Sequence, residues 1–434
     1  MSKHSENAGA TTIGIGRRFC GLCDKTKAAF VPDRQDFWYN ARMDRFRTYK
    51  VGLLVERSRA FGRELCEGVI AFAQTRPDWE LHFIGADEIH RRSLHQTMDG
   101  FIARVTTDAI ASALKSSGKP VVDLYYSKPY PGFAIVKTMH ETVGRLAAEH
   151  FLDRRFRNFA FCPYGGGRTS EYCQGAFARR LRRDGFACAV YPGGGGSYDF
   201  GKSDIISDTM APPRDAKGLL KWLGSLQKPT ALFCPGDLRA WQVVRICQAA
   251  GVNVPRDIAI LGLDNDILIC GASRPMLSSI DPNTREIGRT AAETLAELME
   301  TGLPKKPIVR QVKPRGVVSR ASTESFPIDP PWMSDALVFI MRNACKGANA
   351  SDVFAAIGKS HTTVTKTFRQ VLGTSVVEEV AKARLDEACR LLRDTELDIG
   401  HVAAQSGYAS ASYFMQAFKA SKGMSPSAWR KRGQ

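Results

Sequence analysis

The strongest constraint on this chain is a pattern of helix, tight break and second helix that occurs twice within residues 352–429. The breaks fall at residues 356–358 and 405–407, and each ends in a glycine, which tolerates the backbone of a sharp turn between helices. A polar start and an apolar stripe at helical spacing follow each break. These residues are Ser360, Val364, Phe368 and Val371 or Leu372 in the first unit, and Ser410, Phe414 and Phe418 in the second.

The outward faces of the two helices that follow the breaks carry small, hydrogen-bonding and basic side chains, and neither face carries Asp or Glu. Such a face suits a helix that enters the DNA major groove, where side chains meet base edges and phosphates. We therefore predict that these faces bind DNA. Their residues are His361, Thr362, Thr365, Lys366 and Arg369 in the first helix, and Ala411, Ser412, Met415, Gln416 and Lys419 in the second.

A long amphipathic segment, residues 376–392, joins the two units. We expect it to form one rigid helix, which could hold the two reading helices in successive major grooves, roughly 34 Å apart. The alternative is an ordinary all-α domain whose polar faces are simply solvated. The expected apolar side of the segment consists of Val377, Val380, Ala381, Leu385, Ala388 and Leu392.

Residues 333–434 resemble the double helix-turn-helix domain of the AraC family of transcription regulators. The resemblance implies sequence-specific binding to a promoter or operator in double-stranded DNA, usually as an activator, which would also contact RNA polymerase. Thr362, Thr365 and Ala411 are small at positions that would touch bases, so the operator sequence cannot be derived. The motifs that carry the resemblance include Arg384-Leu385, Val402-Ala403, Gly407-Tyr408, Ser412-Tyr413-Phe414, Ala417-Phe418-Lys419 and Gly423-Met424-Ser425-Pro426.

Length and composition fit a globular protein of two or three domains: 434 residues, 44% hydrophobic and 24% charged. No apolar run approaches the ~20 residues that span a bilayer, and the N-terminus lacks a secretory signal, so we expect a cytoplasmic protein without a membrane partner. The net charge of +17 suits a polyanionic partner, although the excess is spread along the chain. Residues 1–46 lack periodicity and are expected to be a disordered extension, unless translation starts at Met43.

From residue 49 onward, short apolar runs alternate with helical patterns, which indicates βαβ units and parallel sheets. Residues 47–324 are too many for a single sheet with one core, so we predict an α/β region with two lobes. A proline-containing linker, residues 325–332, would connect it to the all-α DNA-binding domain. The expected strands cover residues 49–55, 79–84, 100–103, 120–124, 158–162, 188–191, 230–234, 258–263 and 276–280.

Acidic side chains follow two of the expected strands, where ligands of open parallel sheets bind. Asp237 follows the strand at 230–234, and Asp264 follows the strand at 258–263. Two carboxylates suit a polyhydroxylated ligand because each accepts two charge-assisted hydrogen bonds from hydroxyls. The alternative for Asp237 is a helix cap, a role that is compatible with ligand contact.

This region is similar to the LacI and periplasmic sugar-binding protein family. With the AraC-type domain placed behind it, the order of domains resembles the regulators of xylose operons. The matching motifs include Glu67-Gly68-Val69, Asn158-Phe159-Ala160-Phe161, Asp237-x-Arg239-Ala240, Gly262-Leu263-Asp264-Asn265 and Arg320-x-Ser322-Thr323. The resemblance implies that the ligand is bound by Asp237 and Asp264, with Arg168, Arg59, Phe61 and Arg63 as further candidates.

One departure from this resemblance affects the ligand. Met139-His140 stands where the family usually has an Asp-Asn pair, and a thioether cannot replace the acceptors of a carboxylate. The departure argues against xylose itself and leaves another sugar, a less hydroxylated molecule or no ligand as the alternatives. We expect ligand binding to close the two lobes and to rearrange a homodimer on DNA.

We expect no enzymatic activity. Residues 164–169 lack the Gly-Lys-Ser/Thr ending of a phosphate-binding loop, and no Gly-x-Ser-x-Gly or His-Glu-x-x-His motif occurs. Cys20 and Cys23 form a lone CxxC pair, a weak indication of zinc, and the eight histidines show no metal-ligand spacing. No catalytic residue, metal or cofactor is therefore predicted. A small-molecule-binding protein without regulatory output is a rival, but it would have no use for the C-terminal domain.

Overall fold

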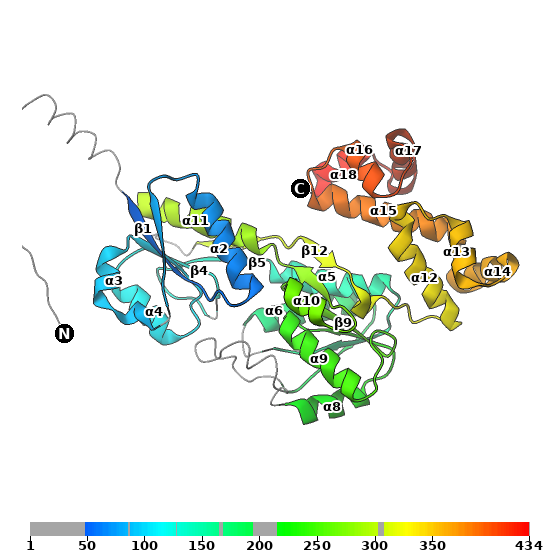
Figure 1. Cartoon of the computed structure of the whole chain (residues 1–434), viewed down its shortest axis with the longest axis horizontal. Coiled ribbons are helices and arrows are strands. Elements are labelled where there is room, and N and C mark those ends of the chain that lie inside the picture. The colour runs from blue at the N-terminus through cyan, green and yellow to red at the C-terminus, as the bar shows by residue number, and fades with distance from the viewer. Residues whose placement is uncertain are drawn as a thin grey trace, which may run out of the picture. The chain divides into compact units, whose positions relative to one another are not determined.

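The computed structural model describes residues 48–433, apart from residues 86, 127, 165–167, 194–214 and 303–307 (Figure 1). The predicted extension 1–46, with Met43, Cys20 and Cys23, lies outside the described residues. In the described part of the chain no helix is long and apolar enough to cross a membrane.

The first lobe of the sensor region contains a six-stranded sheet in which all strands are parallel. Its buried strands are runs rich in Val, Ile and Phe because helices cover both faces of a parallel sheet. In spatial order the strands are β11 (Val309–Val312), β5 (Ala134–Thr138), β4 (Val121–Asp123), β3 (Gly100–Ala103), β1 (Tyr49–Leu54) and β2 (Trp79–Phe83).

The second lobe contains a second six-stranded sheet, in which only the edge strand β12 is antiparallel to its neighbour. The expected strands of this lobe form close to their predicted positions. In spatial order they are β12 (Gly316–Val318), β10 (Ser278–Asp281), β9 (Ile258–Leu263), β8 (Thr230–Phe233), β6 (Asn158–Phe161) and β7 (Cys188–Val190).

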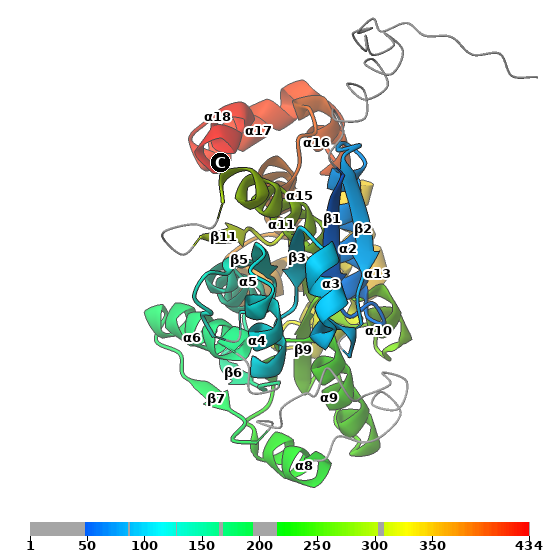
Figure 2. The same ribbon diagram turned by 90° about the vertical axis from the view of Figure 1, so that its left-hand side faces the viewer.

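Helices pack on both faces of each sheet and create four apolar clusters, two in each lobe. Figure 2 shows α2 and α11 side by side, and they pack directly against each other. The helices of the first lobe are α2 (Ala60–Ala73), η1 (Glu88–His90), α3 (Arg92–Thr97), α4 (Asp108–Ser116) and α11 (Thr284–Thr301). Those of the second are α5 (His140–Asp153), α6 (Arg168–Arg183), α8 (Ala216–Ser225), α9 (Asp237–Ala249), α10 (Ile267–Ala272) and η2 (Ala321–Thr323).

The chain passes between the two lobes three times. It crosses from β5 into α5, from β10 into α11, and from β11 into β12. The predicted two-lobed α/β fold is therefore confirmed. The sequence patterns missed β5, β11 and β12. Strand β11 alternates apolar and polar residues, Val309-Arg310-Gln311-Val312, and β12 has only three residues, so neither has the continuous apolar run of a buried strand.

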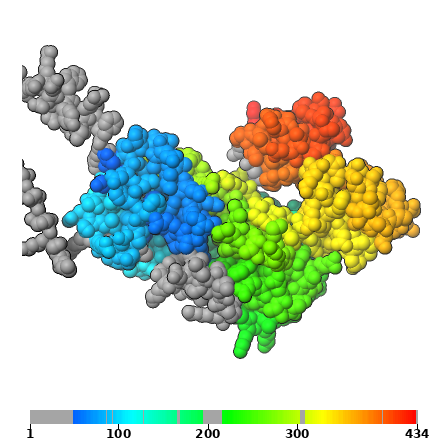
Figure 3. Space-filling model, in the orientation of Figure 1, coloured from blue at the N-terminus to red at the C-terminus, as the bar shows by residue number. Residues whose placement is uncertain are grey.

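The C-terminal region is entirely helical in its described residues, as predicted. Two separate apolar cores, one for each helix-turn-helix unit, share the long helix α15. Figure 3 shows the two units as distinct groups of atoms, coloured yellow to orange and orange to red. The elements are α12 (Pro331–Asn343), η3 (Ala344–Lys346), α13 (Ala350–Ile357), α14 (His361–Leu372), α15 (Val376–Asp394), α16 (Ile399–Gln405), α17 (Ala411–Lys422) and α18 (Pro426–Gly433).

Helix α15 buries four residues of the predicted apolar side, Val380, Leu385, Ala388 and Leu392, but not the other two. Val377 and Ala381 are exposed, whereas Val376 and Leu391 are buried. Ser375 caps the helix, so Val376 is its first residue and the buried stripe starts there. Val377 lies about 100° further round the helix and therefore faces outward. In α14 the stripe likewise ends on the half-buried Leu372 and not on the exposed Val371.

Candidate ligand site and nucleic-acid interface

Asp237, predicted to bind the ligand, is the first residue of α9, and its side chain is fully buried. Its carboxylate accepts hydrogen bonds from Ser279 Oγ at 2.6 Å, from the backbone N–H of Asp266 at 2.7 Å and from Cys270 Sγ at 3.4 Å. Burial, and then the nearby Asp264, hold the pKa of Asp237 well above its usual value. Asp237 thus supports the loop that follows β9 and does not reach its surface.

Asp264, the second predicted carboxylate, lies in a strained backbone conformation. Its φ is +110° and that of Asn265 is +51°, angles that side-chain-bearing residues rarely adopt. The loop is held by the bond from the Asn265 backbone N–H to Ser279 Oγ at 3.0 Å and by Asn265 Oδ1, which accepts from Arg320 at 2.7 Å. Strain that is kept in place by several bonds is a mark of functional loops.

The charge of Asp264 is balanced across the two lobes. Burial raises the pKa of Asp264 to about 7, while Arg104 and Arg59 of the first lobe act to lower it. A hydrogen bond of 3.3 Å from the backbone N–H of Ala60 to the Asp266 carboxylate also joins the lobes. The carboxyl ends of strands from both sheets therefore meet at Asp264, which is where an open α/β sheet binds its ligand.

The first lobe brings Arg59, Phe61 and Arg104 toward this carboxylate, but not Arg63. The guanidinium of Arg104 lies 5.1 Å from the ring centre of Phe61 and 5.2 Å from that of Tyr125. Arg63 of α2 instead donates to the carbonyl oxygens of Arg57 and Ser58 in the loop before this helix. Sequence reasoning missed Arg104. It directly follows β3, as Asp264 follows β9, and this position was the available signal.

Arg168, a further predicted residue, belongs to a second group of cations and aromatic rings. Its guanidinium lies 5.6 Å from the ring centre of Tyr126, and the Lys137 ammonium lies 4.0 Å from the same ring. Lys137 is also 5.0 Å from the ring of Tyr172, against which His140 stacks at 6.2 Å. Burial and then Lys137 lower the pKa of His140 to about 4. This group includes His140 and therefore lies at the position where Met139-His140 replaces the Asp-Asn pair of the family.

The two predicted DNA-reading faces are presented by α14 and α17. Ser360 caps α14 by accepting from the backbone N–H of Thr363, and Ser410 caps α17 in the same way through Tyr413. The face residues are exposed except for Thr365 and Ala411, which are half-buried. The exposed residues are His361, Thr362, Lys366 and Arg369 on α14, and Ser412, Met415, Gln416 and Lys419 on α17.

Two face residues of α14 have partners within the domain. His361 packs against Phe354, with ring centres 4.4 Å apart. Arg369 forms an ion pair with Glu378 of α15 at 3.1 Å. Glu378 also completes a capping box with Ser375, so this carboxylate is fixed beside the face predicted to meet phosphates.

The first unit is tied to α15 and to the second unit through η3. Arg384 of α15 donates to the carbonyl oxygens of Ala344 and Ala348, both at 3.0 Å. Gly407, at the break of the second unit, has φ +79°, and a Cβ there would lie 2.8 Å from the Ala344 carbonyl oxygen. These close backbone contacts hold the second unit against η3 of the first.

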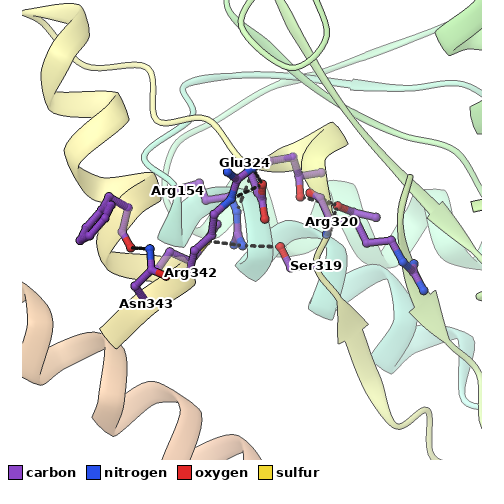
Figure 4. A network of polar contacts seen from close by, with 10 residues as sticks. Arg154, Ser319, Arg320, Glu324, Arg342 and Asn343 are labelled. Carbon is purple, nitrogen blue, oxygen red and sulfur yellow. Dashed lines mark hydrogen bonds and ion pairs between the residues drawn. The ribbon is translucent and has the colours of Figure 1, made fainter. Parts of the chain in front are cut away.

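A polar network connects the loop after β9 with helix α12 (Figure 4). Arg320, which holds Asn265, is followed by Thr323, whose carbonyl oxygen accepts from Arg154 at 3.2 Å. Arg154 also donates to Ser319 Oγ at 2.9 Å and to Met341 Sδ of α12 at 3.2 Å. Glu324 accepts from Arg342 of α12 at 2.8 Å.

Comparison with known proteins identifies the same two regions, the α/β sensor and the helical DNA-binding domain. Residues 148–323 match the periplasmic binding protein-like domain, and residues 353–432 match a helix-turn-helix domain. The chain is 26% identical over 397 residues to the xylose operon regulatory protein of Escherichia coli K12, with 88% of this chain and 97% of that protein covered. The protein of the same name from Haemophilus influenzae is 24% identical over 392 residues, with 88% and 98% covered.

Solved structures give the same result. The structure of the xylose-binding transcription activator XylR matches with a TM-score of 0.54 and 25% identity, covering 89% of this chain and 99% of that one. A ribose-bound LacI family regulator from Enterococcus faecium matches with a TM-score of 0.51 over 64% of this chain and all of its own length, and at 21% identity it shows the fold alone. The chain is therefore an XylR-like transcription regulator, in which a LacI-type, periplasmic-binding-protein-like sensor is joined to an AraC-type double helix-turn-helix domain.

Proposed function

We propose that this regulator activates a carbohydrate-utilisation operon when a sugar-like ligand binds beside Asp264. The observation that carries the proposal is the strained Asp264-Asn265 loop, in which one residue interacts with the other lobe and the next residue with the network that leads to α12. Asp264 is balanced by Arg104 and Arg59 of the other lobe, and Asn265 is bonded to Arg320 of the network leading to α12. The xylose-related names of the relatives support a carbohydrate as the ligand.

In this proposal Asp264 accepts hydrogen bonds from ligand hydroxyls, and Arg104 and Arg59 close over it. Phe61 and Tyr125 supply aromatic surface beside Arg104, which suits the apolar face of a sugar ring. Asp237 acts as a positioning residue because it holds the backbone of Asp266 and is itself buried. Ligand binding would favour the closed arrangement of the lobes, since only that arrangement offers both sets of contacts.

The signal would reach the DNA-binding domain through the loop after β9. A change in Asp264-Asn265 moves the partner of Arg320. The segment behind Arg320 contacts Arg154 at the end of α5 in the sensor and Arg342 of α12 in the helical domain. Phe326 and Ile328 of the predicted linker 325–332 pack against the core of the first helix-turn-helix unit. We infer that this linker moves together with that unit and is not a free tether.

On DNA, we propose that α14 and α17 enter successive major grooves and that a homodimer presents four such helices to a promoter. Lys366, Arg369 and Lys419 would meet phosphates, whereas Thr362, Ser412 and Gln416 are placed to meet base edges. An activator bound in this way contacts RNA polymerase, and the protein acts in the cytoplasm, where promoter DNA is found.

The test is DNA binding with and without sugar. Fluorescence anisotropy with the DNA upstream of the operon that contains its gene should give specific binding that a sugar changes at least fivefold, the low end of allosteric coupling. Scrambled DNA of equal length is the control. A chain that binds both DNAs equally, or whose affinity no sugar alters, would refute the proposal. A monomer bound to the full operator at saturation in analytical ultracentrifugation would refute the dimer.

A further inference from the structure

Lys137 and Arg168 form a pair of cations without an acidic partner. Both pack on the ring of Tyr126, and burial, followed by the charge of Arg168, lowers the pKa of Lys137. Within the described residues, no carboxylate lies within ion-pair distance of either side chain. By contrast, Arg104 and Arg59 act on Asp264 across the lobes. Two adjacent like charges that are partly buried cost free energy unless an anion joins them.

The surroundings of the pair also favour a negative charge. His140 is the first residue of the 14-residue helix α5, and Arg168 is the first residue of the 16-residue helix α6. Helix N-termini carry partial positive charge, and the stacking of His140 on Tyr172 places the start of α5 beside α6, one turn after the first residue of α6. His140 Nδ1 is buried and has no hydrogen-bond partner among the described residues, so it can serve a bound group.

The ring that carries the pair is one residue along the chain from a ring of the Asp264 region. Tyr126, which carries both cations, follows Tyr125, which packs on Arg104. Tyr126 has a φ of +52°, so the backbone between the two rings is itself held in an unusual conformation. A ligand with hydroxyls at Asp264 and an anionic group at Lys137 would therefore contact both rings along one short stretch of chain.

We propose that the ligand of this sensor is an anionic sugar, a sugar acid or a sugar phosphate, whose charged group is bound by Lys137 and Arg168, with His140 donating a further hydrogen bond. This inference rests on the proposed function and specifies its ligand class. A neutral sugar leaves the two cations uncompensated, whereas a carboxylate or phosphate replaces their repulsion by charge-assisted hydrogen bonds.

The test is isothermal titration of the full chain with matched ligands. The neutral set is xylose, ribose, glucose and galactose. The acids are xylonate, glucuronate and galacturonate, and the phosphates are ribose 5-phosphate and glucose 6-phosphate. We expect one charged compound to bind at least tenfold more tightly than its neutral parent, the gain of a buried charge-assisted contact. The better of the two charged sets tells carboxylate from phosphate.

Variants of Lys137 and Arg168 test whether these residues cause the preference for a charged compound. Lys137→Met should reduce the preference for the charged compound over its neutral parent by about tenfold or more, Lys137→Arg should retain it, and exposed Lys115→Met in the same lobe should not change it. Thermal unfolding checks that each variant is folded. If Lys137→Met does not fold, Arg168→Met provides the second test.

The outcomes separate the two proposals. If neutral sugars bind and the charged compounds bind no better, the anionic ligand is wrong and the sugar sensor stands. If no compound in any set binds, both proposals are wrong. If a charged compound binds but folded Lys137→Met and Arg168→Met retain full affinity, the assignment to this pair is wrong.

Discussion

Replacing Asp264 by Asn is predicted to stabilise the free protein while abolishing its response to ligand. The folded structure raises the pKa of this carboxyl from 3.8 to about 7, chiefly by burial. That rise corresponds to about 4 kcal/mol of destabilisation once the group is ionised. The attraction of Arg104 and Arg59 is already included, because both act to lower the same pKa. A neutral amide of similar size removes most of this cost.

The effect has a defined pH dependence. An acid whose pKa is higher in the folded state makes the protein less stable as pH rises from about 4 to about 7, because the unfolded chain loses its proton first. The advantage of Asp264→Asn should therefore be largest at pH 8, at most about 4 kcal/mol, and less than half of that at pH 5. For a region of this size the upper limit corresponds to about 8 °C in melting temperature.

Scanning calorimetry of the wild type and of Asp264→Asn at pH 5 and pH 8 measures this difference. Asp184→Asn, at the exposed end of α6, is the matched control and should change little. Adding the ligand should raise the melting temperature of the wild type but not that of Asp264→Asn. A variant that is less stable than the wild type at pH 8, or one that still responds to ligand, would contradict the reasoning.

Three further predictions concern the DNA-binding domain and its coupling to the sensor. Gly407→Ala should lower the free energy of unfolding by at least about 2 kcal/mol and weaken DNA binding, because φ +79° and the 2.8 Å distance to the Ala344 carbonyl oxygen both oppose a Cβ. The control Gly423→Ala, at φ +72° with open space around it, should lower it by about half as much, as measured by thermal unfolding. Glu378→Gln keeps the capping box but frees Arg369, so anisotropy should show tighter DNA binding and a steeper salt dependence; unchanged binding would mean that Arg369 does not meet phosphate. Arg320→Met should reduce the coupling between ligand binding and DNA binding to less than about threefold and leave the DNA affinity without ligand unchanged. Arg315→Met, the control, should keep the full coupling, and full coupling in Arg320→Met would exclude this route.

The sequence alone determined the helix-turn-helix units because their signals are local. In both units a turn glycine precedes a capping serine, and buried apolar residues follow that serine at four and eight positions; each signal acts within one or two helical turns. The alternation of strands and helices likewise predicted two parallel sheets, since it follows from how each segment buries its own apolar side. Asp264 could be found in the same way, from its position directly after a buried strand.

Only the tertiary structure decided which polar groups work together. Asp237 and Asp264 look equivalent along the chain, yet one is buried beneath the loop and the other lies opposite Arg104 and Arg59. Likewise, Lys137 and Arg168 are 31 positions apart in the sequence and belong to different elements, and they meet only on Tyr126. The physical reason is that burial and pairing depend on contacts between distant segments, which spacing along one segment does not encode.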